Sequence, residues 1–201
     1  MVNLAIFDYG AGNIFSLKNS LEKTGATVDV ITNFDKPNIY SGLLLPGVGN
    51  FDPAIKSISK SKTNFINYVK DNTPVLGICL GMEMFFDKSE EGNEKGLGVI
   101  KGDVIILPPS MKVPHMGWNN LEIKKSGKIL EGVKDSAWVY FVHSYRVNPA
   151  NNDIITAESD YGIKVPAVVE QGNFFGTQFH PEKSGKVGKI MIQNFLDVCK
   201  K

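Results

Sequence analysis

Short apolar runs alternate with amphipathic stretches along the first part of the chain. Three runs are almost continuously apolar, which is typical of strands buried on both faces of a sheet; they are residues 2–7, 42–46 and 74–78. Apolar residues at helical spacing predict helices over residues 14–24 and 52–71. Residues 27–31 are β-branched and predict a further strand. Strands that alternate with helices in this way indicate a parallel sheet covered on both faces.

The pattern changes after residue 96. Short segments rich in β-branched and aromatic residues follow one another between turns, which favours strands. These segments are residues 99–107, 121–123, 138–142, 154–158, 167–170 and 174–179. We expect them to extend the sheet in an antiparallel or mixed way, and residues 187–198 to close the chain as an amphipathic helix. Without a repeat or a linker-like stretch, the pattern predicts a single α/β domain over residues 1–201.

Composition and charge narrow the class of protein. Of 201 residues, 42% are hydrophobic and 21% are charged, which fits a folded chain with one full core. The formal net charge of +1 gives no electrostatic case for binding nucleic acid or an anionic membrane. The first residues lack the basic segment of a signal peptide, and no run approaches the length of a membrane span. We therefore expect a cytoplasmic protein.

Cysteine and histidine are rare enough to be followed one by one. The chain has two cysteines, three histidines and a single arginine, Arg146. Two cysteines are too few for a disulfide scaffold and fit a reducing compartment. No two of the histidines and cysteines have metal-ligand spacing, so we expect no metal site and no cofactor.

The first candidate for chemistry is Gly77-Ile-Cys79-Leu-Gly81, where a buried strand should turn sharply into a helix over residues 80–86. Glycines two residues before and after Cys79 leave room for such a turn. We expect the helix N-terminus to favour the Cys79 thiolate, and the Leu80 amide to face an oxyanion formed beside the sulfur. The alternative is a buried structural cysteine.

His180-Pro-Glu182 offers a base and a carboxylate that could orient it. In an extended segment residues i and i+2 project to the same side, so Glu182 can hold the His180 ring in the tautomer that accepts a proton from Cys79. The alternative is a strand-end histidine beside a solvated glutamate. Pro46-Gly-Val-Gly49 ends another predicted strand and is either an oxyanion loop or a plain turn.

The other two histidines lie in the segments Pro114-His-Met-Gly-Trp-Asn119 and Phe141-Val-His-Ser-Tyr-Arg146. Both segments combine apolar bulk with polar tips, which suits a partner surface or the wall of a pocket. The alternative for His115 and His143 is a core histidine with its hydrogen bonds satisfied, and composition alone favours it. We expect Cys199, near the end of the last helix, to be structural or exposed.

Together these residues resemble the class I glutamine amidotransferases, from Asp8 to the last helix. The Cys79 turn resembles the nucleophile elbow of that family, and His180-Pro-Glu182 resembles its other two triad members. Four segments further resemble the glutaminase subunits of imidazole glycerol phosphate synthases: Asp8-Tyr-Gly-Ala-Gly-Asn13, Pro46-Gly-Val-Gly49, Pro114-His-Met-Gly-Trp-Asn119 and Phe141-Val-His-Ser-Tyr-Arg146. The implied fold has three layers, flavodoxin-like, with a mixed, mostly parallel sheet and helices on both faces.

The resemblance implies that the chain hydrolyses L-glutamine through a thioester on Cys79, with His180 as base and Glu182 as its orienting group. The ammonia would pass to a (β/α)₈-barrel cyclase subunit, the partner in a heterodimer that makes imidazole glycerol phosphate and AICAR in histidine biosynthesis. The resemblance places Leu80 and, after its loop turns, Val48 in the oxyanion hole. Substrate contacts fall to Gly47, Gly49, Glu83, Ser144 and Tyr145. Contacts with the partner fall to Asn13, Met116, Trp118, Tyr140 and Lys183.

One position departs from the pattern of the family, because relatives commonly have glutamine where this chain has Glu83. A carboxylate there would repel the carboxylate of the substrate.

Other functions also stay open at this point. A paralogous glutaminase could serve another synthase, for example in the amidination of a surface sugar. A stand-alone cysteine hydrolase and a non-catalytic binding subunit are the two alternatives from other classes.

Overall fold

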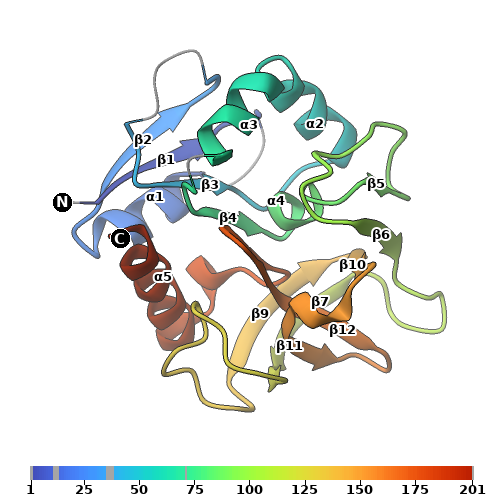
Figure 1. Ribbon diagram of the computed structural model, residues 1–201. Helices are drawn as coiled ribbons and strands as arrows, with labels where there is room; N and C mark the ends of the chain where they lie inside the picture. The colour runs from blue at the N-terminus through green and yellow to red at the C-terminus, as the bar shows by residue number, and fades with distance from the viewer. Residues whose placement is uncertain (1, 11–13, 35–38, 71, 201) are drawn as a thin grey trace.

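The computed structural model describes residues 2–10, 14–34, 39–70 and 72–200 (Figure 1). Eight strands form its central sheet: β1 (Asn3–Phe7), β2 (Thr27–Ile31), β3 (Gly42–Leu45), β4 (Val75–Ile78), β8 (Glu122–Ile123), β11 (Ile155–Asp160), β12 (Lys164–Gln171) and β13 (Phe174–Thr177). Their order is β2-β1-β3-β4-β13-β12-β11-β8. The strands from β2 to β13 pair in parallel, and the strands from β13 to β8 pair antiparallel. The prediction of a mixed, mostly parallel sheet is confirmed.

Helices cover both faces of this sheet (Figure 1). The long helices are α1 (Ile14–Glu22), α2 (Phe51–Ser59), α3 (Lys62–Lys70) and α5 (Gly185–Cys199). Successive side chains of a strand point to opposite faces, and β1 shows this division directly. Leu4 and Ile6 share one apolar cluster with α1 and α5, whereas Ala5 and Phe7 share the other with α2 and α3. The sheet is therefore buried on both faces, as its continuous apolar strands indicate.

Two smaller sheets lie beside the central one. One pairs β7 (His115–Asn120) with β9 (Trp138–His143), and the other has the order β10-β6-β5, from β10 (Tyr145–Pro149), β6 (Gly102–Ile106) and β5 (Lys88–Ser89). The short elements α4 (Leu80–Glu83) and η1 (Asn152–Ile154) connect strands, and η2 (Pro181–Lys183) connects β13 to α5. The chain passes from β9 into β10 at Ser144, which is therefore the corner between the two small sheets.

The carboxyl ends of β3, β4 and β13 meet at one edge of the central sheet, which is where open α/β sheets hold their ligands. In the pairing of β4 with β13, Ile78 lies opposite Thr177. The amide of Cys79 donates to the carbonyl oxygen of Thr177 at 2.6 Å. This register brings the residues that follow β4 beside those that follow β13.

Several predicted boundaries were wrong. The helix predicted over residues 52–71 is two helices, α2 and α3, which are separated at Lys60 and Ser61; serine is a weaker helix former than alanine or leucine. The helix predicted over residues 80–86 ends at Glu83, after which Phe85 and Phe86 make tighter turns. The strand predicted over residues 99–107 begins only at Gly102, whose φ is +131°. No described helix is long and apolar enough to cross a membrane.

Candidate active site

Cys79 occupies a sharp turn between β4 and α4. Its φ of 48° and ψ of −107° are a strained conformation for a residue with a side chain. The flanking glycines make the turn possible. A Cβ on Gly81 would collide with the carbonyl oxygen of Leu45, and a Cβ on Gly77 would lie 2.6 Å from the carbonyl carbon of Gly81. The turn therefore has the sharp geometry expected of a nucleophile elbow, and packing requires both glycines.

The Cys79 thiol is buried, with the residue 6% exposed. Its Sγ lies 3.8 Å from the carbonyl oxygen of Val142 and 3.7 Å from Nε2 of Gln178. Burial, and then the Glu83 carboxyl, raise the pKa of the thiol well above its usual value, and the hydrogen bonds from the Leu80 amide and Gln178 lower it less. The expectation of a thiolate in the resting protein was wrong, because burial outweighs the single turn of α4. A nucleophilic attack by this sulfur would therefore require a base that removes its proton.

His180 and Glu182 form a buried pair after β13. Nδ1 of His180 lies 2.8 Å from Oε1 of Glu182, and the two side chains are 1% and 7% exposed. Because the carboxylate accepts, Nδ1 carries the proton and Nε2 is free to accept. Nε2 is buried and has no hydrogen-bond partner among the described residues. The backbone of His180 is fixed too, since its amide donates to Tyr140 O at 2.9 Å and its carbonyl accepts from Ser184 Oγ at 2.6 Å.

A cleft of about 310 Å³ opens beside the elbow. It brings together nine residues predicted from the sequence or its resemblance, which are Gly47, Val48, Gly49, Cys79, Leu80, Glu83, His143, Ser144 and Tyr145; Glu91, Pro114 and Val142 complete its lining. Gly47 lies close to the His180 ring. A Cβ there would stand 2.6 Å from Ile78 O and 3.1 Å from Cε1 of His180, so only glycine fits at this position.

Glu83 lies in the wall of the cleft and is 4% exposed. The pKa of its carboxyl is raised to about 8, mainly by burial. The hydrogen bond from Gln178 lowers this pKa, and the nearby Glu91 carboxylate raises it. Nε2 of Gln178 donates to Oε1 of Glu83 at 3.2 Å. Glu83 is therefore a neutral acid at neutral pH, which removes the charge conflict expected with a substrate carboxylate.

The sequence did not single out Gln178 or Glu91. Gln178 bridges Cys79 and Glu83 with one amide nitrogen. Glu91 accepts from the amide of Phe51 at 2.9 Å and reaches the cleft from a turn after β5. The place of Gln178 two residues before His180 was a usable signal, because residues i and i+2 share one side of an extended segment. No local pattern marked Glu91.

His115 and His143 are both buried and hydrogen-bond to one another at 2.9 Å. The prediction of core histidines with satisfied hydrogen bonds is confirmed for both. His143 also lines the cleft, so it is both a core histidine and part of a pocket wall.

Of the residues expected to face a partner, Met116 and Trp118 are 62% and 53% exposed on the outer face of β7. The Trp118 and Tyr140 rings meet edge to face at 6.0 Å, and Nζ of Lys183 stands 5.9 Å from the Tyr140 ring centroid. Trp138, which the sequence did not single out, is 58% exposed at the start of β9. Asn13 lies outside the described residues.

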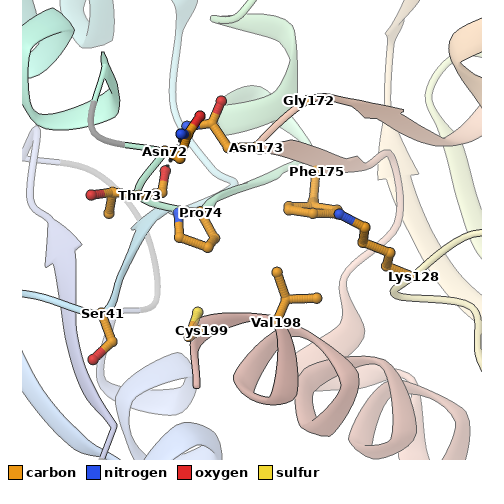
Figure 2. A pocket seen from close by; sticks show the side chains of 10 residues that line it. All are labelled: Ser41, Asn72, Thr73, Pro74, Lys128, Gly172, Asn173, Phe175, Val198 and Cys199. Carbon is orange, nitrogen blue, oxygen red and sulfur yellow. Dashed lines mark hydrogen bonds between the residues drawn. The ribbon is translucent and has the colours of Figure 1, made fainter. Parts of the chain in front are cut away.

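Cys199 lies far from the elbow, in the wall of a larger cavity of about 520 Å³ at the amino ends of β4 and β13 (Figure 2). Burial raises the pKa of its thiol to about 12, and a Cβ on Gly42 would stand 2.5 Å from its Sγ. This thiol is a packing group. In the described part of the chain, no three His, Cys, Asp or Glu side chains gather as a metal site would require.

Comparisons with known proteins agree with this geometry. The family model "Glutamine amidotransferase class-I" matches residues 5–199. The imidazole glycerol phosphate synthase subunit HisH of Archaeoglobus fulgidus is 46% identical over 202 residues, covering 98% of this chain and 100% of the relative. The protein of the same name from Methanocaldococcus jannaschii is 43% identical over 196 residues, covering 97% and 99%.

A crystal structure of a glutamine amidotransferase superposes with a TM-score of 0.77 at 18% identity, covering 98% of this chain and 99% of the other. The structure of PurLQS from Thermotoga maritima superposes with a TM-score of 0.75 at 18% identity, covering 98% of each chain. The chain belongs to the class I glutamine amidotransferases. The resemblance to the glutaminase subunits of imidazole glycerol phosphate synthase is confirmed by the relatives named HisH.

Proposed function

We propose that this chain is the glutaminase subunit of imidazole glycerol phosphate synthase, that it hydrolyses L-glutamine to glutamate and ammonia, and that it acts in histidine biosynthesis. One observation carries the proposal. A cysteine on a strained elbow lines the cleft, and a buried histidine–glutamate pair follows the adjacent parallel strand, with the His180 ring close to Gly47 of the same cleft. A nucleophile, a base and an orienting carboxylate are the parts that acyl transfer through a thioester requires.

In the first half of the reaction, Sγ of Cys79 attacks the side-chain carbonyl carbon of glutamine. Nε2 of His180 takes the thiol proton, while Glu182 holds the ring through Nδ1 at 2.8 Å. The tetrahedral intermediate collapses when the carbon–nitrogen bond breaks. His180 gives its proton to the departing nitrogen, which leaves as ammonia, and a glutamyl thioester remains on Cys79.

In the second half, His180 takes a proton from water, whose oxygen attacks the thioester carbon. The carbon–sulfur bond breaks, glutamate leaves, and the proton returns to the sulfur. In both halves the negative oxygen accepts from the Leu80 amide and, once the loop of Gly47 to Gly49 has turned, from the Val48 amide as the second donor. The loss of one such donor costs about 10²–10³ in rate in a well-studied hydrolase.

The cleft walls hold the rest of the substrate. Backbone groups of Gly47, Gly49, Ser144 and Tyr145 lie around the elbow and bind the amino-acid end of glutamine. Glu83, being neutral, supplies a hydrogen-bond donor and an acceptor there.

The partner, a (β/α)₈-barrel cyclase subunit, docks on the face formed by Met116, Trp118, Tyr140 and Lys183. Tyr140 links this face to the triad, since its carbonyl oxygen accepts from the His180 amide at 2.9 Å. Ammonia released beside Cys79 then enters the barrel instead of water. A partner bound to this face therefore contacts Tyr140, a residue that is hydrogen-bonded to the backbone of His180.

The test is a glutaminase assay with and without the cyclase and its nucleotide substrate, on the unaltered chain, Cys79→Ala and His180→Ala. We expect ammonia release that depends on the partner, and a loss of at least about 10³-fold in both variants. Synthesis supported by added ammonium salt should survive in both, since the cyclase then needs no glutamine.

Each alternative predicts a different outcome. Equal hydrolysis with and without the cyclase would indicate a stand-alone hydrolase. Cys79→Ala complexes that still use glutamine would indicate a binding subunit. Failure of the chain to associate with the cyclase would indicate a paralogue that serves another synthase.

A further inference from the structure

Two of the three histidines take no part in the reaction described above. His115 on β7 lies directly opposite His143 on β9, and the two residues are 3% and 5% exposed. Nδ1 of His115 lies 2.9 Å from Nε2 of His143. Directly opposite residues in an antiparallel pair share one face, so the rings join the two strands through a buried side-chain hydrogen bond.

The hydrogen bonds around this pair run in one direction. Nδ1 of His143 lies 2.7 Å from the carbonyl oxygen of Tyr145, which can only accept, so this nitrogen carries the proton. Burial lowers the pKa of His143 to about 3 and that of His115 to about 4, so both rings are neutral at neutral pH. Nε2 of His143 then accepts from Nδ1 of His115. The remaining nitrogen of His115 accepts from Nδ2 of Asn119 at 3.3 Å.

Asn119, the donor at one end of this run of hydrogen bonds, is held in place. Nδ2 of Asn119 also donates to the carbonyl oxygen of Asp160, at the end of β11, at 2.9 Å. The His115 ring stacks on Phe141 at 4.6 Å and 20°, and on Tyr161 at 3.9 Å and 21°. Stacking and hydrogen bonds together leave His115 one orientation.

The acceptor end lies at the cleft. β9 ends at His143 and β10 begins at Tyr145, so Ser144 is the corner between them. The hydrogen bond from the His143 ring to Tyr145 O spans this corner. All three residues line the cleft beside Cys79. The position of the corner therefore depends on the His143 ring, and the ring depends on His115.

The opposite face of β7 carries Met116 and Trp118, which are exposed. We propose that the His115–His143 pair is a positioning device for glutamine: it ties the Ser144–Tyr145 corner of the cleft to the strand on which the cyclase docks. This inference rests on the proposed function of the cleft. The pair touches neither the reacting carbonyl nor the sulfur, so its effect falls on substrate affinity.

The test measures glutamine hydrolysis by the complex with the cyclase subunit. His143→Phe keeps an aromatic ring at this position and removes both hydrogen bonds. We expect KM for glutamine to rise about tenfold while kcat changes by less than about threefold, since one such hydrogen bond corresponds to roughly that factor in affinity. His143→Asn, whose amide can stand near the position of Nδ1, should recover most of the affinity.

His115→Phe keeps the stacking and removes the hydrogen bonds to His143 and Asn119. It leaves the bond from His143 to Tyr145 in place, so we expect a smaller rise in KM. Tyr161→Phe is the matched control, because it keeps the stacked ring and removes only a hydroxyl that donates to Lys112 O at 2.7 Å. Its KM should equal that of the unaltered complex. Nitrogen NMR of the histidine rings should show both as neutral Nδ1–H tautomers at pH 7.

An unchanged KM in His143→Phe would overturn the proposal. So would a loss of synthesis from ammonium salt in that variant, which would mean general damage to the assembly, or the absence of recovery in His143→Asn. Cys79→Ala keeps the two inferences apart. If it still hydrolyses glutamine, the proposed function fails; if it does not and His143→Phe leaves KM unmoved, only the positioning role fails.

Discussion

At the scale of single residues, burial decides the charge state of the cleft. Glu83 and Cys79 both hold their protons at neutral pH, because the interior penalises the charged form of each. The elbow is therefore uncharged at rest, and the Cys79 thiol loses its proton only when substrate and base act together. Glu83 departs from the glutamine usual among relatives, yet as a neutral acid it offers a donor and an acceptor, as an amide does.

The protonation of Glu83 predicts how stability depends on pH. Its pKa is about 8 in the folded chain against 4.5 for an ordinary glutamate, so between these values the folded state holds a proton that the unfolded state has lost. Stability must then fall as pH rises through this window, by a few kcal/mol. Glu83→Gln should remove most of that fall. Urea unfolding of the chain at pH 6 and pH 9 measures the difference.

Glu131→Gln is the matched control for this prediction, because Glu131 is exposed and distant from the cleft. Its pH profile should follow that of the unaltered chain. If Glu83→Gln also follows it, Glu83 is ionised in the folded protein, and the account of a neutral cleft is wrong.

At the scale of elements, the elbow depends on how closely α4 approaches β3. A Cβ on Gly81 would meet the backbone carbonyl of Leu45, which cannot swing away as a flexible side chain would. We expect Gly81→Ala to cost about 3 kcal/mol or more in the free energy of unfolding, and to abolish glutamine hydrolysis. Denaturant unfolding of the purified chain measures the first effect.

Gly132→Ala gives the comparison. Gly132 is exposed, has a φ of +71° and leaves a Cβ in open space, so alanine there brings only backbone strain, about 1–2 kcal/mol. Equal losses in the two variants would show that the contact with Leu45 does not limit the elbow.

The long apolar strands and the pairing of His180 with Glu182 could be predicted from the sequence, because each depends on neighbours in the chain. β1, β3 and β4 are continuous apolar runs, and His180-Pro-Glu182 sits in one extended segment. β7 was missed because Gly117, Asn119 and Asn120 are poor strand formers. The strand forms through its pairing with β9. Glu91 was missed because a fold, not a local pattern, brings it to the cleft.

At the scale of the whole molecule, one exposed face is linked to His180, whose amide donates to the Tyr140 carbonyl. On that face the Tyr140 ring contacts both the Trp118 ring and the Lys183 ammonium. Large aromatic residues at the centre of an interface commonly carry most of its binding energy. We expect Trp118→Ala to raise the dissociation constant for the cyclase about 30-fold, which titration calorimetry measures.

Ile190→Ala supplies the control, because Ile190 is another exposed apolar residue, 39% exposed, on α5. Its complex should form with unchanged affinity. Weakening by Ile190→Ala together with no effect of Trp118→Ala would place the partner on a different face of the molecule.

The central claim is that Cys79 is the nucleophile that attacks glutamine, and covalent labelling tests it most directly. The complex with the cyclase is treated with an electrophilic glutamine analogue, and the modified residue is identified by mass spectrometry. We predict one label on Cys79, protection by glutamine, and no label on Cys199, whose thiol is buried in packing on the far edge of the sheet. Loss of glutaminase activity with the label on any other residue, and Cys79 unmodified, would contradict the account.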